Sequence, residues 1–277
     1  MAIRIIAADM DGTLLSPDKK ITPRTQAAVQ AAMDAGALFV LNSGRMAESI
    51  MPYARQLDVN APIICFNGAL TYDTRAMCPS ACIPLDKEVA RRIMTMVEEL
   101  GLYAQGYWGH EYYCAQYNDK TRVYEEKNRV YAHVTQQPLS QVIPSDVYKL
   151  LVILDPGQMR TVLPRLARAF EQVASCSASS ETYLEIVAKG ASKGAALRAL
   201  GASCGVAPSE IMAFGDELND LSMLTMAGYG YAMANASEAV RRQVRLVAPS
   251  NGEDGLAQVM ERCAQEGLFA APRGVGV

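Results

Sequence analysis

The sequence predicts an α/β fold, a Rossmann-like parallel sheet core with helices on both faces, plus an inserted α+β domain. Residues 3–8 form an apolar run interrupted only by Arg4, as in a strand that is buried on both faces. Strand-like and helix-like patterns alternate in the first and last thirds, which is typical of parallel strands joined by helical crossovers. The middle third differs, because it holds nine of the thirteen tyrosines and the single tryptophan.

After the first apolar run, the first third continues as helix, strand, helix, strand. Thr22 and Pro23 predict a helix start, because threonine caps a helix and proline fits its first turn, and Gly36 ends this helix. A second strand is expected at 37–41 and, after a short helix, a third at 62–66. This order predicts three parallel strands in one sheet.

The last third resumes the same alternation of strands and helices. Ser192 is placed to cap the first of its helices. Helices are expected at 193–200, 219–227, 238–243 and 254–265, and strands at 211–214, 229–233 and 244–248.

The middle of the chain reads as a separate module between two halves of one domain, with a single continuous sheet as the alternative. Aromatic residues in its strands suit a half-exposed sheet. We therefore expect a discontinuous core of residues 1–83 and 189–277, with an inserted domain of residues 84–188. Within the insert, strands are expected at 112–117, 148–154 and 183–187, and helices at 87–100 and 158–171.

Composition argues against several classes of protein. The net charge of −3 and the lack of a Lys/Arg run argue against nucleic-acid binding. No stretch approaches the roughly 18 apolar residues of a membrane span, and the start of the chain does not resemble a secretory signal. The seven cysteines include no C-x-x-C pair, which favours reduced thiols over a zinc site. We expect a cytoplasmic protein without nucleic-acid or membrane partners, a monomer by default and otherwise a dimer.

Polar residues stand at the carboxyl ends of the predicted core strands. Ligands bind outside this edge in open parallel sheets. Five such residues in register therefore predict one crevice that forms a site. They are Asp9, Ser43, Asn67, Asp216 and Asn251.

The carboxylates expected in this crevice call for a cation. Asp9, Asp11, Asp216 and Asp220 would lie near one point, which is unfavourable without a positive charge between them. Oxygen ligands without histidine or thiolate suit a hard ion, and Mg²⁺ is the usual one with phosphate substrates. The sequence therefore predicts a magnesium site.

Three further residues are candidates for holding a phosphate. Lys193 falls in the first turn of its helix, where the helix dipole disfavours a cation. Beside an acidic cluster, it suits a clamp on a phosphate or on a phosphorylated aspartate. The hydroxyl of Ser43 and the backbone of Gly44 offer neutral donors for phosphate oxygens.

Other motifs do not fit this sequence. An EF-hand loop from Asp9 would need glycine and glutamate where Leu14 and Lys20 stand. The stretch KGASKGAAL is not a phosphate-binding P-loop, and the glycines at 228 and 230 lack the third glycine of a dinucleotide fingerprint.

The segment Asp9-Met10-Asp11-Gly12-Thr13-Leu14 resembles the D-x-D-G-T-L signature of the haloacid dehalogenase-like (HAD) phosphohydrolases. The insert between the second and third motifs resembles the type 2 cap of the Cof-like sugar-phosphatase branch, and the resemblance covers almost the whole chain. The second motif has serine where threonine is usual, which keeps the hydroxyl. The other three motifs of the family follow in order as Ser43-Gly44-Arg45, Lys193 and Gly215-Asp216-Glu217-Leu218-Asn219-Asp220.

The resemblance implies a division of labour among the acids. Asp9 would be the nucleophile that forms an aspartyl-phosphate, and Asp11 would act as general acid and then as base. Met10 between them would point into the core. Mg²⁺ would be held by Asp9, the backbone carbonyl of Asp11, and Asp216, with Asp220 as a ligand or a supporting carboxylate.

The resemblance also implies contacts to the substrate. Ser43 and Lys193 would hold the phosphoryl group, with Asn219 as a further phosphate contact. Asn67 would face the substrate, and Arg45 would serve either substrate or structure. Tyrosines of the insert and Trp108 could stack on a sugar or heterocyclic ring, although most would pack in the core of the insert.

The function expected from the resemblance is a Mg²⁺-dependent phosphatase of small phosphorylated metabolites, sugar phosphates foremost. A phosphotransferase or phosphomutase that uses the same aspartyl-phosphate is the nearest alternative. A non-catalytic ligand sensor is a further alternative, although it would not need both the nucleophile and the acid.

Overall fold

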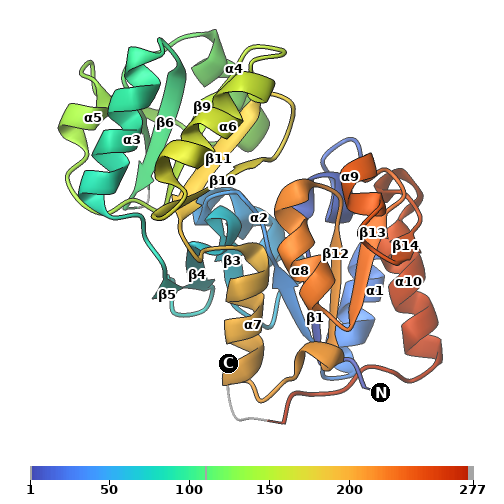
Figure 1. The fold of residues 1–277 in the computed structure, drawn as a ribbon. Helices are drawn as coiled ribbons and strands as arrows, with labels where there is room; N and C mark the ends of the chain where they lie inside the picture. Colours follow the sequence, from blue (N-terminus) through green and yellow to red (C-terminus); the bar gives the residue numbers. More distant parts are fainter. Residues whose placement is uncertain (1, 110, 274–277) are drawn as a thin grey trace.

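The computed structural model describes residues 2–109 and 111–273. A parallel sheet with helices on both sides forms one part of the molecule, and a six-stranded sheet with its own helices forms the other (Figure 1). The chain passes from the first part to the second after strand β5 (Cys78–Cys82) and returns before helix α7 (Lys193–Ser203) (Figure 1). The predicted α/β class is confirmed, and the domain boundaries at 83/84 and 188/189 stay a prediction.

The core sheet is parallel throughout. Its strand order is β14-β13-β12-β1-β2. Ile5 pairs with Leu38 on one side and with Ile211 on the other. The interior position of β1, between β12 and β2, explains why its residues form an unbroken apolar run. The strands are β1 Ile5–Ala8, β2 Leu38–Leu41, β12 Ile211–Gly215, β13 Tyr229–Met233 and β14 Leu246–Ala248.

Side chains of β1 alternate between two apolar clusters, one on each face of the sheet. Ile6 packs in the cluster that contains Val29 of α1 and Met260 of α10, whereas Ile5 packs with Leu197 of α7. Thr22 caps α1, because its hydroxyl accepts a hydrogen bond from the Thr25 amide at 3.1 Å. The helices are α1 Pro23–Asp34, α2 Ala47–Leu57, α7 Lys193–Ser203, α8 Leu221–Met226, α9 Glu238–Arg241 and α10 Gly255–Gln265.

The third predicted strand departs from the expected parallel sheet. It forms β3 (Ile63–Cys65), which touches the core sheet through one parallel bridge, between Ile64 and Asn42. The chain reverses directly after it, because Phe66, Asn67 and Gly68 all have positive φ angles of 50°, 55° and 90°. The prediction of a full parallel neighbour was therefore wrong. An antiparallel sheet of β3, β4 (Leu70–Asp73) and β5 (Cys78–Cys82) forms instead.

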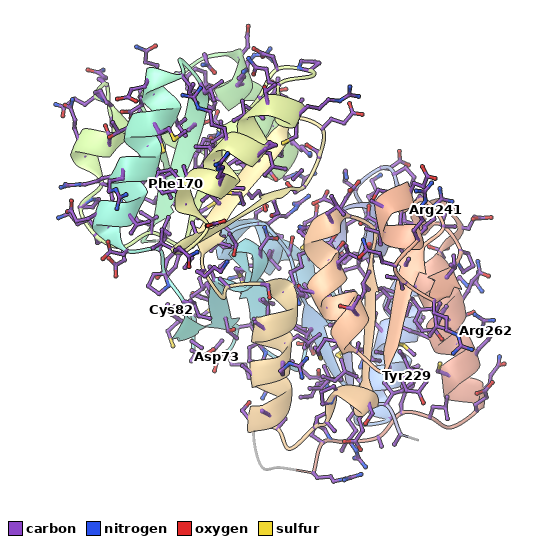
Figure 2. All side chains as sticks on the ribbon, in the orientation of Figure 1. Asp73, Cys82, Phe170, Tyr229, Arg241 and Arg262 are labelled. Carbon is purple, nitrogen blue, oxygen red and sulfur yellow. The ribbon has the colours of Figure 1, made fainter. Side chains whose placement is uncertain are left out.

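Strand β5 forms an edge of this small sheet. All five of its residues are exposed, and Cys82 lies near the margin of the molecule (Figure 2). None of the seven cysteines is in a disulfide, which agrees with the expected free thiols.

The six-stranded sheet has the order β10-β11-β9-β6-β7-β8 and is antiparallel except between β7 and β8. Strands β6, β8 and β10 and helices α4 and α5 were not predicted. The strands are β6 Tyr103–Trp108, β7 Glu111–Cys114, β8 Ala132–Val134, β9 Lys149–Ile153, β10 Ala174–Ala178 and β11 Tyr183–Ala188. The helices are α3 Lys87–Glu99, α4 Asp119–Asn128, α5 Leu139–Val142 and α6 Met159–Phe170.

Aromatic residues form much of the interior of this second part. Tyr107 and Tyr112 are fully buried, with ring centroids 5.7 Å apart. Trp108 stacks on Tyr113 at 3.9 Å between centroids. These rings therefore pack against one another, as expected for most of them.

Short helical turns follow several core strands and shape the edge where the strands end. They are Met10–Leu14, Phe66–Gly68, Leu218–Asp220 and Asn251–Glu253, whereas a further turn, Pro208–Glu210, precedes β12. Within the described ranges, no helix has the length and apolar character needed to cross a membrane.

Candidate active site

The turn after β1 carries two aspartates, Asp9 and Asp11, that line the same cavity. Asp9 and Asp11 flank Met10, which is fully buried in the core as expected. Gly12 has a φ of +81°, and a Cβ atom there would lie 2.1 Å from the Asp216 carboxylate. The turn therefore needs glycine both for its backbone and for the close approach of Asp216.

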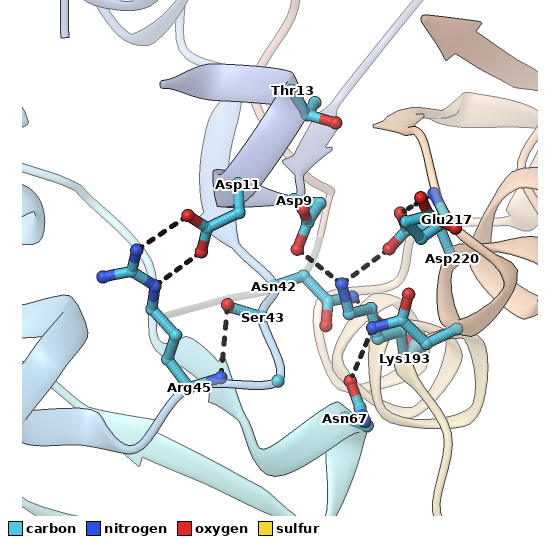
Figure 3. Close-up of polar contacts among 12 residues, drawn as sticks. Asp9, Asp11, Thr13, Asn42, Ser43, Arg45, Asn67, Lys193, Glu217 and Asp220 are labelled. Atoms are coloured by element: carbon cyan, nitrogen blue, oxygen red, sulfur yellow. Dashed lines mark hydrogen bonds and ion pairs between the residues drawn. The ribbon is translucent and has the colours of Figure 1, made fainter. Parts of the chain in front are cut away.

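Lys193 lies fully buried between two of the carboxylates. Its Nζ atom is 2.5 Å from Asp9 Oδ1 and 2.6 Å from Asp220 Oδ1 (Figure 3). Burial alone would lower the pKa of Lys193, but Asp220 and Asp9 raise it above its usual value. Ser192 fixes the start of α7, because its hydroxyl accepts a hydrogen bond from the Ala195 amide at 3.1 Å. The helix therefore delivers a charged ammonium group to Asp9.

Asp220 is occupied on both of its oxygens. Oδ1 contacts Lys193, and Oδ2 accepts hydrogen bonds from the amides of Asp216 and Glu217 at 2.9 and 3.0 Å. A carboxylate with these partners has little capacity left for a metal. We therefore place Asp220 as a support for the loop after β12 and for Lys193.

The remaining acids fit a cation. Ligand atoms of Asp9 and Asp216 lie within 4.8 Å of each other, in a buried group that also includes Asp220. Burial raises the pKa of Asp9, partly offset by Lys193 and reinforced by Asp220. Burial also raises the pKa of Asp216, and the charges of Asp9 and Asp220 add to it. Only Thr13, at 3.0 Å from Oδ1, donates a side-chain hydrogen bond to Asp216 within the described chain. Hard oxygen ligands with uncompensated negative charge are what Mg²⁺ prefers.

Ser43 and Gly44 follow β2 and face the same space. The Ser43 hydroxyl oxygen accepts a hydrogen bond from the Arg45 amide at 3.3 Å, which leaves its proton available to a ligand (Figure 3). The Ser43 amide donates to the Ile64 carbonyl at 2.9 Å, so the single bridge to β3 fixes this loop.

Arg45 holds the second aspartate. Its Nε and Nη2 atoms lie 2.7 and 2.8 Å from the two oxygens of Asp11, and Lys19 Nζ lies 2.7 Å from Oδ1. Burial alone would raise the pKa of Asp11, but the hydrogen bonds and charges of Arg45 and Lys19 hold it well below its usual range. Arg45 also donates to Ser49 at 3.2 Å.

Two asparagines complete the group that the sequence predicts. Asn219 donates to Asn67 Oδ1 at 3.0 Å, and Asn67 donates to Glu185, a residue of β11. Asn67 is buried with its amide engaged, so it contacts other side chains of the site.

Asn42 has a structural role that its sequence position did not reveal. It is fully buried, and its amide donates to the Lys193 carbonyl at 3.1 Å. It thereby ties the end of β2 to the start of α7.

Asn251, which we expected in the crevice with the other polar residues at the strand ends, does not line the cavity. Its side chain donates to the Leu15 carbonyl at 2.7 Å, while Asn235 donates to the Gly12 carbonyl at 2.8 Å. Both therefore brace the turn after β1.

A cavity of about 90 Å³ lies where the two parts of the molecule meet. Of the predicted residues, those that line it are Asp9, Asp11, Ser43, Gly44, Arg45 and Asn219. Lys193, Asp216, Asp220 and Asn67 are connected to these residues through the contacts above.

Sequence reasoning did not assign a site role to the other eight lining residues. They come mainly from the six-stranded sheet and α4, and a charged residue inside an apolar strand was the signal that could have revealed Lys149 and Glu185. Tyr124 and Tyr183 are the tyrosines that reach the cavity, whereas Trp108 does not line it. The missed lining residues are Tyr124, Lys127, Asn128, Lys149, Ser179, Tyr183, Glu185 and Glu217.

Comparison with known proteins gives consistent matches over nearly the whole chain. Residues 6–260 match a family model described as haloacid dehalogenase-like hydrolase. Pyridoxal phosphate phosphatase YbhA of Escherichia coli is 29% identical, covering 93% of this chain and 97% of its own. The 5-amino-6-(5-phospho-D-ribitylamino)uracil phosphatase YitU of Bacillus subtilis is also 29% identical, covering 93% and 96%.

Solved structures agree with these sequence matches. A haloacid dehalogenase-like hydrolase from Bacteroides thetaiotaomicron is 28% identical with a TM-score of 0.83, covering 94% of this chain and 99% of its own. A crystal structure from Thermotoga maritima is 31% identical with a TM-score of 0.80, covering 94% and 97%.

Proposed function

The chain belongs to the haloacid dehalogenase-like hydrolases, and from this premise we propose that it is a Mg²⁺-dependent phosphatase that acts through an aspartyl-phosphate on Asp9. Its general class is that of a phosphoric monoester hydrolase. The observation that carries the proposal is the contact of Lys193 with Asp9 at 2.5 Å, beside the buried carboxylate of Asp216. A buried lysine on one acid, next to a second buried acid, suits a nucleophile that must accept a dianionic phosphate.

In the proposed reaction, Asp9 attacks phosphorus and the bond to the ester oxygen breaks. Asp11 gives its proton to the departing alcohol and later takes one from the water that hydrolyses the aspartyl-phosphate. Ser43 and Lys193 donate to the phosphoryl oxygens. Mg²⁺, held by Asp9, Asp216 and the backbone carbonyl of Asp11, would neutralise charge on the phosphoryl group.

Asp11 can act as an acid only after it exchanges its present partners. In the structure it is paired with Arg45 and Lys19, and its low pKa disfavours a proton. We propose that a phosphate ester entering the cavity attracts these cations and releases Asp11. Arg45 would then serve both the substrate and the resting structure.

We propose small phosphorylated metabolites as substrates, with sugar phosphates foremost. The cavity is small, and its lining includes Lys127, Lys149, Glu185 and Ser179, which suit a compact polar leaving group. Two relatives are named for pyridoxal phosphate and for a phosphorylated ribitylamino-uracil, so a heterocyclic leaving group belongs in the same screen. Free thiols throughout the chain support a cytoplasmic location.

The test is hydrolysis of an aryl phosphate by the purified protein. We expect turnover with Mg²⁺, none with a chelator, and none from Asp9→Asn. The exposed Asp18→Asn variant of the same segment is the matched control and should keep wild-type activity. Robust turnover by Asp9→Asn would remove Asp9 as nucleophile.

Product analysis separates the phosphatase from a phosphotransferase or phosphomutase. Hydrolysis releases free phosphate in proportion to the alcohol formed. Transfer to a second sugar hydroxyl would give an isomeric or doubly phosphorylated sugar without equivalent phosphate release.

A further inference from the structure

The six-stranded sheet presents a buried ion pair to the cavity. Lys149 of β9 and Glu185 of β11 are 1% and 5% exposed, and Nζ lies 3.2 Å from Oε1. Both line the cavity, but neither has a role in the phosphoryl-transfer steps described above. A buried ion pair is costly to desolvate and adds little stability by itself, so its retention at a ligand cavity calls for another explanation.

Both members of the pair contact the phosphate-binding loop of the core. Lys149 Nζ donates to the Gly44 carbonyl at 2.6 Å, and Asn67 donates to Glu185 Oε2. The Glu185 carboxylate also lies directly against Gly44, because a Cβ atom there would be 2.9 Å from Oε2. These contacts connect strands β9 and β11 to residues that follow β2 and β3.

Each member of the ion pair is connected to a predicted phosphate donor through one intermediate group. Lys149 is connected to Ser43, and Glu185 is connected to Asn219. The carbonyl of Gly44 shares a peptide group with the Arg45 amide, which donates to the Ser43 hydroxyl at 3.3 Å. Lys149 therefore restrains the peptide that orients the Ser43 hydroxyl. On the other side, Glu185 orients Asn67, whose Oδ1 accepts from Asn219 at 3.0 Å.

We propose that Lys149 and Glu185 are positioning residues that hold the loop at Ser43 and Gly44, together with Asn67 and Asn219, in the geometry that receives the phosphoryl group. Because the pair belongs to the six-stranded sheet, the phosphate site is complete only when that sheet is packed against the core. This inference rests on the proposed function and adds residues from outside the family motifs to the same site. It also explains why Gly44 has no side chain.

The test is a double-mutant cycle between Gly44→Ala and Glu185→Ala. With Glu185 present, the added methyl collides with its carboxylate, and we expect kcat/KM for an aryl phosphate to fall about tenfold. In the Glu185→Ala background the collision with the carboxylate is gone. Asn67, whose Oδ1 lies 3.0 Å from the Cβ position, is then no longer held by Glu185 and can move away from the methyl, so Gly44→Ala should cost about twofold or less. An equal loss in both backgrounds would overturn the proposal, because Gly44 would then act independently of Glu185.

A second background removes both charges, so that no buried ion is left unpaired. The effect of Gly44→Ala is measured in the Lys149→Met/Glu185→Ala variant, where we again expect the loss of kcat/KM to be about twofold or less. Glu111→Ala is the matched control: this glutamate lies on β7 of the same sheet and contacts His133 at 2.9 Å. The loss caused by Gly44→Ala should be unchanged in that background.

A binding measurement keeps this inference separate from the proposed function. The affinity for tungstate, a phosphate mimic, is measured by calorimetry with Mg²⁺ for the same variants. The same coupling between Gly44 and Glu185 is expected in the binding constants, whether or not the wild type hydrolyses the aryl phosphate. Binding constants without coupling would contradict the inference, whereas a wild type without turnover would contradict only the proposed function.

Discussion

Arg45 donates two hydrogen bonds, of 2.7 and 2.8 Å, to the two carboxylate oxygens of Asp11 (Figure 3). Asp9, two residues earlier, contacts Lys193 instead. The two neighbouring aspartates thus have separate cationic partners. Their pKa values shift in opposite directions, upward at Asp9 and downward at Asp11. These directions are opposite to the proposed roles, because a nucleophilic Asp9 must be ionised and an acidic Asp11 must be protonated. The proposed reaction therefore requires a cation beside Asp9 and the release of Asp11 from Arg45.

Arg45→Met should change the pH profile of the enzyme. Without the guanidinium, the pKa of Asp11 rises by roughly 1 to 3 units, because a close opposite charge lowers a carboxyl pKa by about that much. If Asp11 donates a proton in the first step, the basic limb of kcat/KM for an alkyl phosphate should move to higher pH. The measurement is kcat/KM between pH 5 and pH 9, compared with Arg55→Met, a change in the exposed last turn of α2. A profile with an unchanged shape and only a lower height would exclude this effect on Asp11.

Lys193→Met should abolish activity and destabilise the protein. The change leaves Asp9 and Asp220 buried without their shared cation. Breaking a buried ion pair by removing one partner costs about 3–5 kcal/mol. Chemical denaturation measures the loss, with the exposed Lys189→Met as control. A loss below about 1 kcal/mol would show that the carboxylates do not depend on this lysine.

Mg²⁺ should stabilise the folded protein more at high pH than at low pH. The pKa values of Asp9 and Asp216 are raised in the folded state, so folding becomes less favourable as pH rises above about 4, the value in the unfolded chain, and these groups lose their protons. Bound Mg²⁺ offsets the repulsion between the ionised carboxylates of Asp9 and Asp216. At a hundredfold excess over its Kd, it raises the free energy of unfolding by roughly 2.7 kcal/mol. Thermal unfolding with Mg²⁺ and with chelator, at pH 6 and pH 9, measures the difference. Asp216→Asn should remove most of it, and an equal gain at both pH values would contradict the metal assignment.

Gly12→Ala should impair activity far more than its backbone strain explains. A methyl group at this position would enter the Asp216 carboxylate, at 2.1 Å from Oδ2. Gly157→Ala is the matched control, because its φ of +86° is similar and a Cβ there meets nothing within 4 Å. The control should lose about 1–2 kcal/mol of stability and keep its activity. Equal activity in both variants would show that Asp216 tolerates displacement.

Much of the core could be predicted because local patterns determine it. The apolar run of β1, the cap at Thr22 and the serine at 192 each specify an element through its own residues. Placing polar residues at strand ends then brought Asp9, Ser43 and Asp216 to one edge. The third strand was misjudged because its antiparallel pairing depends on the reversal at Asn67, whose left-handed backbone a strand pattern does not show.

The contacts between the two parts of the molecule could not be predicted in the same way. Lys149 lies 105 residues from its partner Gly44, and Glu185 lies 118 residues from its partner Asn67. These partners are set by how one sheet sits on the other. The pairing of Arg45 with Asp11 likewise depends on the path of the loop after β2. Sequence motifs identify the residues whose side chains can carry out the chemistry, whereas tertiary packing determines which of their atoms are in contact.

The central claim is that Asp9 becomes phosphorylated during turnover. Rapid acid quenching of the enzyme with Mg²⁺ and an aryl phosphate, followed by peptide mass analysis, tests it directly. We predict one phosphoryl group on the peptide that contains Asp9, at a level that decays when substrate is exhausted, and none in Asp9→Asn. A wild-type enzyme that turns over while the phosphoryl group appears on another residue, with Asp9 unmodified, would contradict the account.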